Sequence, residues 1–209
     1  MRLILASASP ARLQTLRSAG LAPEVIVSGV DEEALGGPPP AELAQVLADA
    51  KAEAVAARLD DEGAGASADW LLVGCDSVLE LDGAAHGKPG TPEIATQRWQ
   101  AMRGRCGVLH TGHRVIRRAG DRVLSAGRTG STEVHFADLS DAEIAAYVAS
   151  GEPLEVAGAF TIDGLGGAYV RSIVGDPHNV VGISLPLLRD LTAEVAVPWH
   201  TLWSGPSAG

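Results

Sequence analysis

The sequence is short of cysteine and of basic residues, and each shortage excludes a class of protein. Its two cysteines, Cys75 and Cys106, fit neither a zinc-binding Cys-x-x-Cys pair nor a disulfide framework, so we predict both to be small buried hydrophobic residues. With 16 Lys and Arg against 26 Asp and Glu, the net charge is −10. Binding a nucleic-acid polymer needs many basic contacts to phosphates, so we expect none. A local basic pocket for a small anion remains open.

Long apolar runs are also missing. No run is long enough to span a bilayer, and "LILA" at 3–6 is too short for the core of a signal peptide. We therefore expect no membrane association and a cytoplasmic location. The 209 residues, of which 46% are hydrophobic and 20% charged, suit one globular domain.

Hydrophobic periodicity and capping residues predict that strands and helices alternate in the first part of the chain and that β-hairpins occupy its middle. Ser7 or Ser9 would cap the first helix, which ends at Gly20. Ser140 would cap a later helix, where it forms a capping box with the Glu three residues further on. The expected strands span about 2–6, 23–30, 70–81, 110–136 (turning at 119–121) and 166–176; the further helices span 41–59, 92–102 and 184–195. This order predicts an α/β fold with a mixed sheet flanked by helices.

The stretch "SASPAR" at 7–12 is the first candidate site. A helix N-terminus offers unpaired N–H groups and the positive end of the helix dipole, which together bind anions. The hydroxyls of Ser7 and Ser9 add donors, and the Arg12 guanidinium suits phosphate. An ordinary serine cap beside a surface arginine is the alternative.

Further candidates are single charged residues at suggestive places. Asp76 follows an apolar strand, where it could bind a divalent metal, take a proton from water, or only cap a turn. Lys88 lies in the stiff loop "HGKPG", and Lys51 on a helix surface of small residues; each could equally be a solvated lysine. The acidic cluster 31–33, with Glu32 at its centre, could supply oxygen ligands to a hard cation or remain solvated.

Other polar motifs favour structural roles. His110 and His113 do not have the helical spacing of zinc proteases, and we interpret both as structural. "GLGG" at 164–167 and "VVG" at 180–182 do not match a dinucleotide-binding fingerprint. We therefore interpret these glycines as tight turns or points of close backbone approach. Taken together, the anion-binding helix end, the cations and the carboxylates are what phosphoryl or nucleotidyl chemistry requires.

The motifs also resemble a known family, in its order, as far as about residue 202. The matching stretches are "LASASPARLQTL", "DEEA", "AKAEAVA", "GCDSVLELDG…GKP", "HTG", "YVASGEPLEVAGAFTIDGLGG" and "VGDPHNVVGISLPLL". The chain thus resembles the Maf family of nucleoside triphosphate pyrophosphatases. The resemblance implies a single catalytic domain over 1–202, followed by a tail at 203–209 that we expect to be disordered. It also implies an elongated twisted sheet like that of inosine triphosphatases, with two lobes and a central cleft.

The resemblance implies hydrolysis of a nucleoside triphosphate at the α-phosphorus, with a divalent cation such as Mg²⁺ or Mn²⁺. By position, Asp76 would accept the proton, and Asp76 and Glu32 would hold the metal. The triphosphate would be bound by Ser7, Ser9, Arg12, Lys51 and Lys88. The partner is thus a nucleoside triphosphate, and a homodimer is left open.

Three positions depart from the patterns of the family's better-defined branches. The pyrimidine-preferring branch has Arg, Thr and Gln where this chain has Ala11, Ser77 and Asp163. The branch acting on methylated guanosine triphosphate has Trp and Glu at the first and third positions. These residues are therefore the candidates for base specificity, and the preferred base stays open. A usual lysine is also replaced by Val156.

Two other functions remain to be weighed against the enzyme. A nucleotide-binding regulator of cell division without turnover would explain the missing lysine at Val156. Such a binder has no need of Asp76, whose charge would repel a phosphate. A nucleotidyltransferase would require an acceptor site, for which the sequence has no signature.

Overall fold

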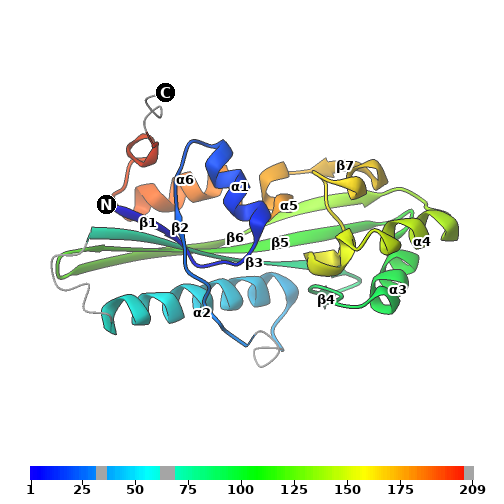
Figure 1. The fold of residues 1–209 in the computed structure, drawn as a ribbon, viewed down its shortest axis with the longest axis horizontal. Coiled ribbons are helices and arrows are strands. Elements are labelled where there is room, and N and C mark those ends of the chain that lie inside the picture. Colours follow the sequence, from blue (N-terminus) through cyan, green and yellow to red (C-terminus); the bar gives the residue numbers. More distant parts are fainter. Residues whose placement is uncertain (32–36, 62–68, 205–209) are drawn as a thin grey trace.

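The computed structural model describes residues 1–31, 37–61 and 69–204 of the chain. A seven-stranded sheet carries helices on both faces (Figure 1). The strands are β1 (Arg2–Leu5), β2 (Glu24–Val25), β3 (Asp69–Leu81), β4 (Ala84–His86), β5 (Cys106–Ala119), β6 (Arg122–Phe136) and β7 (Val170–Val174). The helices are α1 (Pro10–Ser18), α2 (Pro40–Asp61), α3 (Pro92–Met102), α4 (Asp141–Ala149), α5 (Pro177–Val181) and α6 (Leu185–Glu194). Short 3-10 turns span Glu152–Glu155, Ala157–Ala159, Leu165–Tyr169 and Trp199–Leu202.

The sheet is mixed, as the sequence predicts. Its strand order is β2-β1-β3-β5-β6-β7, and β4 pairs with β3 outside this path. Strand β1 runs parallel to β2 and β3, while the pairs β3–β4, β3–β5, β5–β6 and β6–β7 are antiparallel. The two lobes and the central cleft implied by the resemblance stay predictions.

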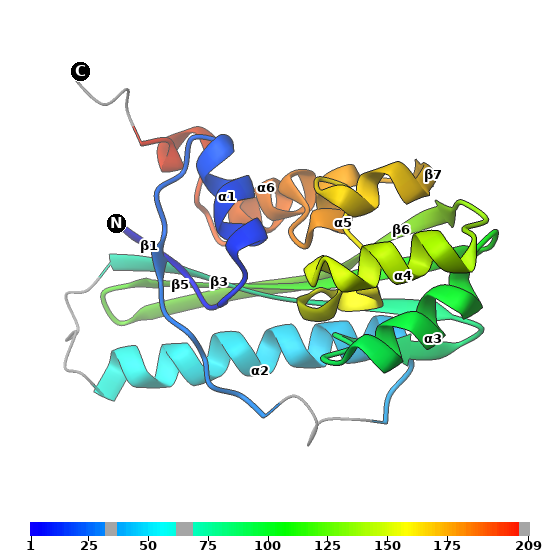
Figure 2. The same ribbon diagram turned by 45° about the vertical axis from the view of Figure 1, so that its right-hand side comes forward.

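Helix α2 lies along one face of the sheet, and α1, α5 and α6 lie on the other (Figure 2). Small residues explain how closely α2 approaches. A Cβ atom at Gly112 would lie 2.1 Å from the carbonyl oxygen of Ala44, and one at Gly74 would lie 2.7 Å from that of Ala48. Glycine in the strands and alanine on the helix therefore let the backbones touch, which fixes where every residue of α2 meets the sheet.

Separate groups of buried apolar residues hold the helices against the sheet. Leu16 of α1 and Leu188 and Leu191 of α6 pack with β3 residues such as Leu71 and Val73. At the other end, the side chain of Trp99 in α3 is buried among residues of α4, β5 and β6, and its indole N–H donates to the carbonyl oxygen of Ala159 over 2.8 Å. Burial of this kind is the main favourable term in folding.

Most predicted elements are confirmed. The strand expected at 166–176 is shorter than predicted, because Leu165–Tyr169 form a 3-10 turn before β7. The strand expected at 23–30 is wrong beyond Glu24–Val25: Val27 is 53% exposed, and after Ile26, whose N–H donates to the carbonyl oxygen of Leu5, β1 offers no further pairing partner. The prediction that both cysteines are buried holds for Cys75 and is wrong for Cys106, which is exposed at the start of β5.

The helix caps agree with the sequence. Ser9 caps α1, and Ser140 and Glu143 form the capping box of α4. In the tail, Ser204 donates its backbone N–H to the carbonyl oxygen of Gly20, so the first residues after 202 are bonded to the domain; residues 205–209 lie outside the described part. Within the described ranges, no helix combines the length and apolar character needed to cross a bilayer.

Candidate active site

The candidate site lies at a gap in the pairing of one edge of β3. On this edge β3 pairs with β1 over Trp70–Val73 and with β4 over Leu79–Leu81, which leaves 74–78 between the two partners. Strand β1 runs parallel to β3, so the chain after Leu5 continues toward the gap. Strand β4 runs antiparallel, so the chain after His86 approaches the gap from the opposite end. Ligands often bind where such strand ends meet.

The helix N-terminus predicted to bind an anion stands where β1 ends. The Ser9 side chain accepts a hydrogen bond from the backbone N–H of Arg12 (3.4 Å), and the Ser7 hydroxyl accepts one from the backbone N–H of Ser9 (3.2 Å). Pro10 occupies the first turn, where its missing N–H costs nothing. The two serines and the helix end therefore form one compact group of hydroxyls and backbone donors.

The Arg12 side chain is buried and fixed by three acceptors. Nη1 donates to the Ser7 hydroxyl (3.0 Å), Nη2 to the Ser77 hydroxyl (3.0 Å) and Nε to the carbonyl oxygen of Gly182 (2.7 Å). The hydroxyl of Ser77 also lies 3.0 Å from that of Thr111. A guanidinium held in this way is pre-organised, so binding a phosphate oxygen requires little loss of side-chain entropy.

Asp76 and Lys51 form an ion pair at the same gap. Successive side chains of β3 point to opposite faces, so Asp76 shares the α2 face with Gly74 while Ser77 faces α1. The Lys51 ammonium on α2 bonds to Oδ1 of Asp76, and each of these side chains is only 10% exposed. The close packing of α2 on Gly74 is what brings Lys51 within reach.

Lys88 is not joined to this group by any contact within the described residues. Lys88 is exposed on the loop after β4, and in the described ranges it makes no hydrogen bond or ion pair with the other predicted residues. Its loop is nevertheless fixed, because the carbonyl oxygen of Gly87 accepts hydrogen bonds from Gly158 and Arg98. Glu32 lies outside the described residues.

Two of the three base-specificity candidates line one pocket. Ala11 and Asp163 are both on the wall of a cavity of about 270 Å³, together with Gln14, Thr15, Ser18, Ala19, His178, Val181 and Leu185. Ser77 is not part of this wall; it is bonded to Arg12 instead. The structure therefore separates Ser77 from the other two candidates.

Several buried polar residues around the site were missed by the sequence analysis. The side-chain amide N–H₂ of Asn179 donates to the carbonyl oxygen of Leu109 and to the Thr132 hydroxyl, and the backbone carbonyl oxygen of Asn179 accepts from the Thr111 hydroxyl. These bonds join α5 to the sheet, which positions Gly182. The only available signal was the motif "DPHN", in which Asp176 caps α5.

Glu152 is a second residue that the sequence analysis missed, and it organises the loop that bears Asp163. Its carboxylate accepts hydrogen bonds from the hydroxyls of Tyr147 and Thr161 and from the backbone N–H groups of Leu165 and Gly166. Burial alone would raise the pKa of Glu152, but these hydrogen bonds lower it below its ordinary value.

The structural interpretation of the two histidines agrees with their contacts. The Nε2 atom of His113 accepts a hydrogen bond from the backbone N–H of Ser184 (2.8 Å), and Nδ1 lies 2.9 Å from the carbonyl oxygen of Thr111. Burial, and secondarily the Arg12 charge, lowers the pKa of His113 to about 4, so its ring is neutral at physiological pH. His110 is bonded on both ring nitrogens, to Glu80 and to Ser131.

Fold and site together define an α/β protein in which a buried arginine bonded to serine hydroxyls lies beside a buried lysine–aspartate pair. A sequence model described as "Maf-like protein" matches residues 2–195. The chain therefore belongs to the Maf family. It is 59% identical to a nucleoside triphosphate pyrophosphatase of Streptomyces coelicolor, over 97% of this chain and 95% of the relative. Proteins with the same name in Leifsonia xyli and Cutibacterium acnes are 53% and 52% identical, with 98% and 99% of this chain and 97% and 96% of the relatives covered.

Proposed function

We propose that this protein hydrolyses a nucleoside triphosphate at its α-phosphorus and releases the nucleoside monophosphate and pyrophosphate. The observation that carries the proposal is the meeting of two elements at one gap in β3: the Arg12–Ser7–Ser77 group on one side and the Lys51–Asp76 pair on the other. The names of the relatives and their identity over nearly the whole chain support the same reaction.

Asp76 is the proposed general base. In the reaction, the oxygen of a water molecule bonds to the α-phosphorus, the bond from that phosphorus to the bridging oxygen breaks, and a proton of the water passes to Asp76. Only Oδ1 of Asp76 is bonded to Lys51. Its other oxygen, Oδ2, accepts no hydrogen bond within the described residues and is therefore available to the water.

The cations would stabilise the charge that develops on the leaving pyrophosphate. Arg12 and the α1 N-terminus are rigid donors, whereas Lys88, on its anchored loop, would approach from the other end of the gap. Since these groups are aligned before the substrate arrives, the transition state requires little reorganisation.

The donor set also suits a hard divalent cation. Carboxylate oxygens are the ligands that Mg²⁺ and Mn²⁺ prefer, and the resemblance implies the carboxylates of Asp76 and Glu32 as these ligands. When bound, the ion would neutralise part of the charge of the phosphates. Asp76 would in addition orient the attacking water.

We place the base in the cavity shared by Ala11 and Asp163. The carboxylate of Asp163 is exposed there and can accept hydrogen bonds from the N–H groups of a base. Ala11 leaves space that a larger side chain would fill. We also infer a cytoplasmic location, where the triphosphates are.

The test is an assay that measures pyrophosphate and orthophosphate separately. The purified protein is incubated with each common and modified triphosphate and either Mg²⁺ or Mn²⁺. We expect pyrophosphate and monophosphate in equal amounts, and loss of at least about 10²-fold in kcat in Asp76→Asn. Chelation of the divalent cation should stop the reaction and its return should restore it.

Three results would contradict the proposal. Release of orthophosphate alone would place the cleavage at another phosphorus. Full activity of Asp76→Asn would remove Asp76 as the base. Nucleotide binding without turnover of any triphosphate would favour a nucleotide-binding regulator instead.

A further inference from the structure

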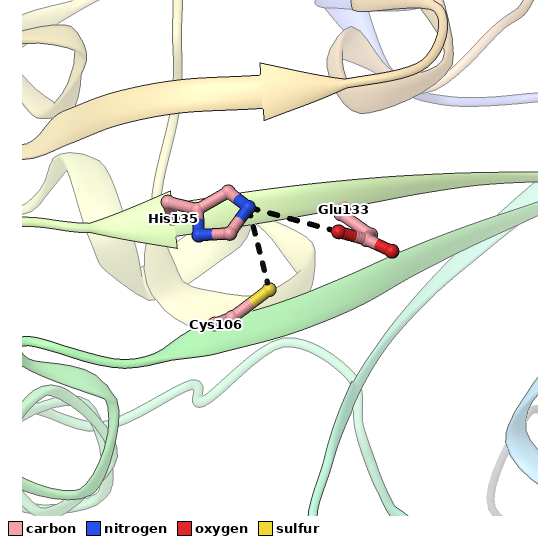
Figure 3. Close-up of side chains that lie close together, drawn as sticks. All are labelled: Cys106, Glu133 and His135. Atoms are coloured by element: carbon pink, nitrogen blue, oxygen red, sulfur yellow. Dashed lines mark hydrogen bonds and ion pairs between the residues drawn. The ribbon is translucent and has the colours of Figure 1, made fainter.

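Three side chains with metal-binding atoms gather on the sheet away from the candidate active site. Cys106 opens β5, and Glu133 and His135 stand near the end of β6. One ligand atom from each, a thiol sulfur, a carboxylate oxygen and an imidazole nitrogen, lies within 4.8 Å of the other two. Figure 3 shows the three side chains pointing toward one another from the two neighbouring strands.

The strand register puts the three side chains on one face. Cys106 pairs directly with His135, and Glu133 precedes His135 by two residues, so it points to the same side. This cluster shares its face with Asp76, which pairs with Gly112 on β5. From Gly112 to Cys106 the strand continues for six residues, which is about 20 Å. The cluster is therefore separate from the catalytic pair.

The backbone on both sides of the cluster is fixed. Hydrogen bonds from Gly104 to Ala137 and from Phe136 to Arg105 tie the entry of β5 to the end of β6. On its other side His135 pairs with Ser172 of β7. The positions from which the donors project are thus set before any ion binds, which lowers the entropy that binding must overcome.

The distances are close to those of a tetrahedral metal site. The Cys106 sulfur lies 3.8 Å from Nε2 of His135, and a Glu133 oxygen lies 3.6 Å from the same nitrogen. Zinc bonds of about 2.3 Å to sulfur and about 2.1 Å to nitrogen or oxygen, at a tetrahedral angle, would put donors about 3.4–3.6 Å apart. The remaining pair, the Cys106 sulfur and the Glu133 oxygen, lies within 4.8 Å, and rotation of these two side chains would have to close it to the same range.

The donor types select the metal class. A thiolate and an imidazole favour borderline ions such as Zn²⁺ over Mg²⁺ and Ca²⁺, which prefer oxygen ligands. The cluster is also reachable, since the side chains of His135 and Glu133 are 41% and 54% exposed. Three protein ligands leave a fourth position for water, as in open zinc sites.

We propose that Cys106, Glu133 and His135 form a peripheral site for a divalent transition-metal ion, with Zn²⁺ as the best match. As the zinc–sulfur bond forms, the thiol releases its proton to solvent. The bound ion joins the start of β5 to the end of β6 and so stabilises this end of the sheet. The site is independent of the hard cation proposed for catalysis.

The test uses Co²⁺ as a spectroscopic probe on the full chain. We expect a thiolate-to-cobalt charge-transfer absorption that saturates at one equivalent and disappears when Zn²⁺ is added. Cys106→Ser should lose this absorption. His135→Ala and Glu133→Gln should weaken cobalt binding at least about tenfold, because loss of residues that only support metal ligands already reduces metal affinity by about that factor. His200→Ala, which removes an exposed histidine elsewhere, is the matched control and should bind as the unchanged protein does.

A thermal unfolding series with Zn²⁺ provides a second readout. The midpoint should rise with zinc concentration in the unchanged protein and in His200→Ala, because the ion binds the folded state, and much less in Cys106→Ser. The proposal is overturned if no charge-transfer absorption develops, or if Cys106→Ser retains both the absorption and the zinc-dependent midpoint. Cys106→Ala replaces Cys106→Ser should the latter fail to fold.

Discussion

The Nε atom of Arg12 donates a hydrogen bond of 2.7 Å to the carbonyl oxygen of Gly182, a residue 170 positions further along the chain. This contact joins the first helix to the turn between α5 and α6 and aims the guanidinium at the gap in β3. The site is therefore assembled from distant segments, and its function should respond to changes at each of them.

The two lysines of the site should behave differently when each is replaced by alanine. We expect Lys88→Ala to raise KM and lower kcat with little change in the free energy of unfolding, because the side chain is exposed and its proposed role is to bind the substrate phosphates. Lys51→Ala should impair catalysis and also lower the free energy of unfolding by about 1–3 kcal/mol, because it leaves the Asp76 carboxylate unpaired in a mostly buried place. Kinetics and urea unfolding of both variants test this. Unchanged kinetics in Lys88→Ala would remove that residue from the site.

Arg12→Lys should be as harmful as a non-conservative change. The ammonium of lysine cannot donate in three fixed directions, so Ser77 and the carbonyl oxygen of Gly182 would lose their donor. We expect a fall of about 1–3 kcal/mol in the free energy of unfolding and a higher KM. Steady-state kinetics beside chemical denaturation measure both effects. The exposed pair formed by Arg189 and Asp190 offers a control, since Arg189→Lys should change neither quantity.

Gly182→Ala should lower stability and activity together. The φ angle of Gly182 is 118°, and an added Cβ would lie 3.2 Å from Nε of Arg12. Gly83→Ala is the control, because Gly83 also has a positive φ (77°) but has open space around its Cβ position. Both variants should lose about 1–3 kcal/mol through backbone strain, whereas only Gly182→Ala should raise KM. Equal KM values for the two variants would show that the Gly182 contact does not position Arg12.

His113 should make stability fall as the pH is lowered through the weakly acidic range. Burial lowers the pKa of His113 in the folded protein to about 4, against an ordinary value of 6.5. Between these values the unfolded chain binds a proton that the folded one does not, so stability rises with pH in that window. Lowering the pH from 7.5 to 5 should therefore reduce the free energy of unfolding by about 2 kcal/mol. Denaturation at both pH values measures the loss, and His113→Gln should remove most of it.

Glu152→Gln should alter which base is preferred more than it alters the chemical step. The carboxylate holds the loop around Asp163 through four donors, and a neutral amide is a weaker acceptor that also presents an unmatched N–H₂ group. We expect the ratio of kcat/KM between triphosphates to change at least about tenfold, with a smaller change in the best kcat. Glu155→Gln, a change at an exposed neighbour in the same turn, should leave the ratio unchanged. Equal ratios in both variants would contradict the positioning role.

Elements whose signal is local can be predicted from the sequence. The Ser9 and Ser140 caps, the long strands and the alternation of strand and helix follow from hydrogen-bonding side chains and hydrophobic periodicity within a few residues. The same local reading was wrong for 23–30, because an apolar run becomes a strand only where a neighbour pairs with it.

Which of the candidate residues lie together follows from packing and strand pairing between distant segments. Lys51 reaches Asp76 because glycines of the sheet admit α2 at backbone distance, and Arg12 is aimed by a carbonyl group far away in the chain. The tertiary structure also separated Ser77 from Ala11 and Asp163, and joined Cys106, Glu133 and His135 through strand register. These contacts depend on packing and strand pairing between segments far apart in the chain, so no local sequence pattern predicts them.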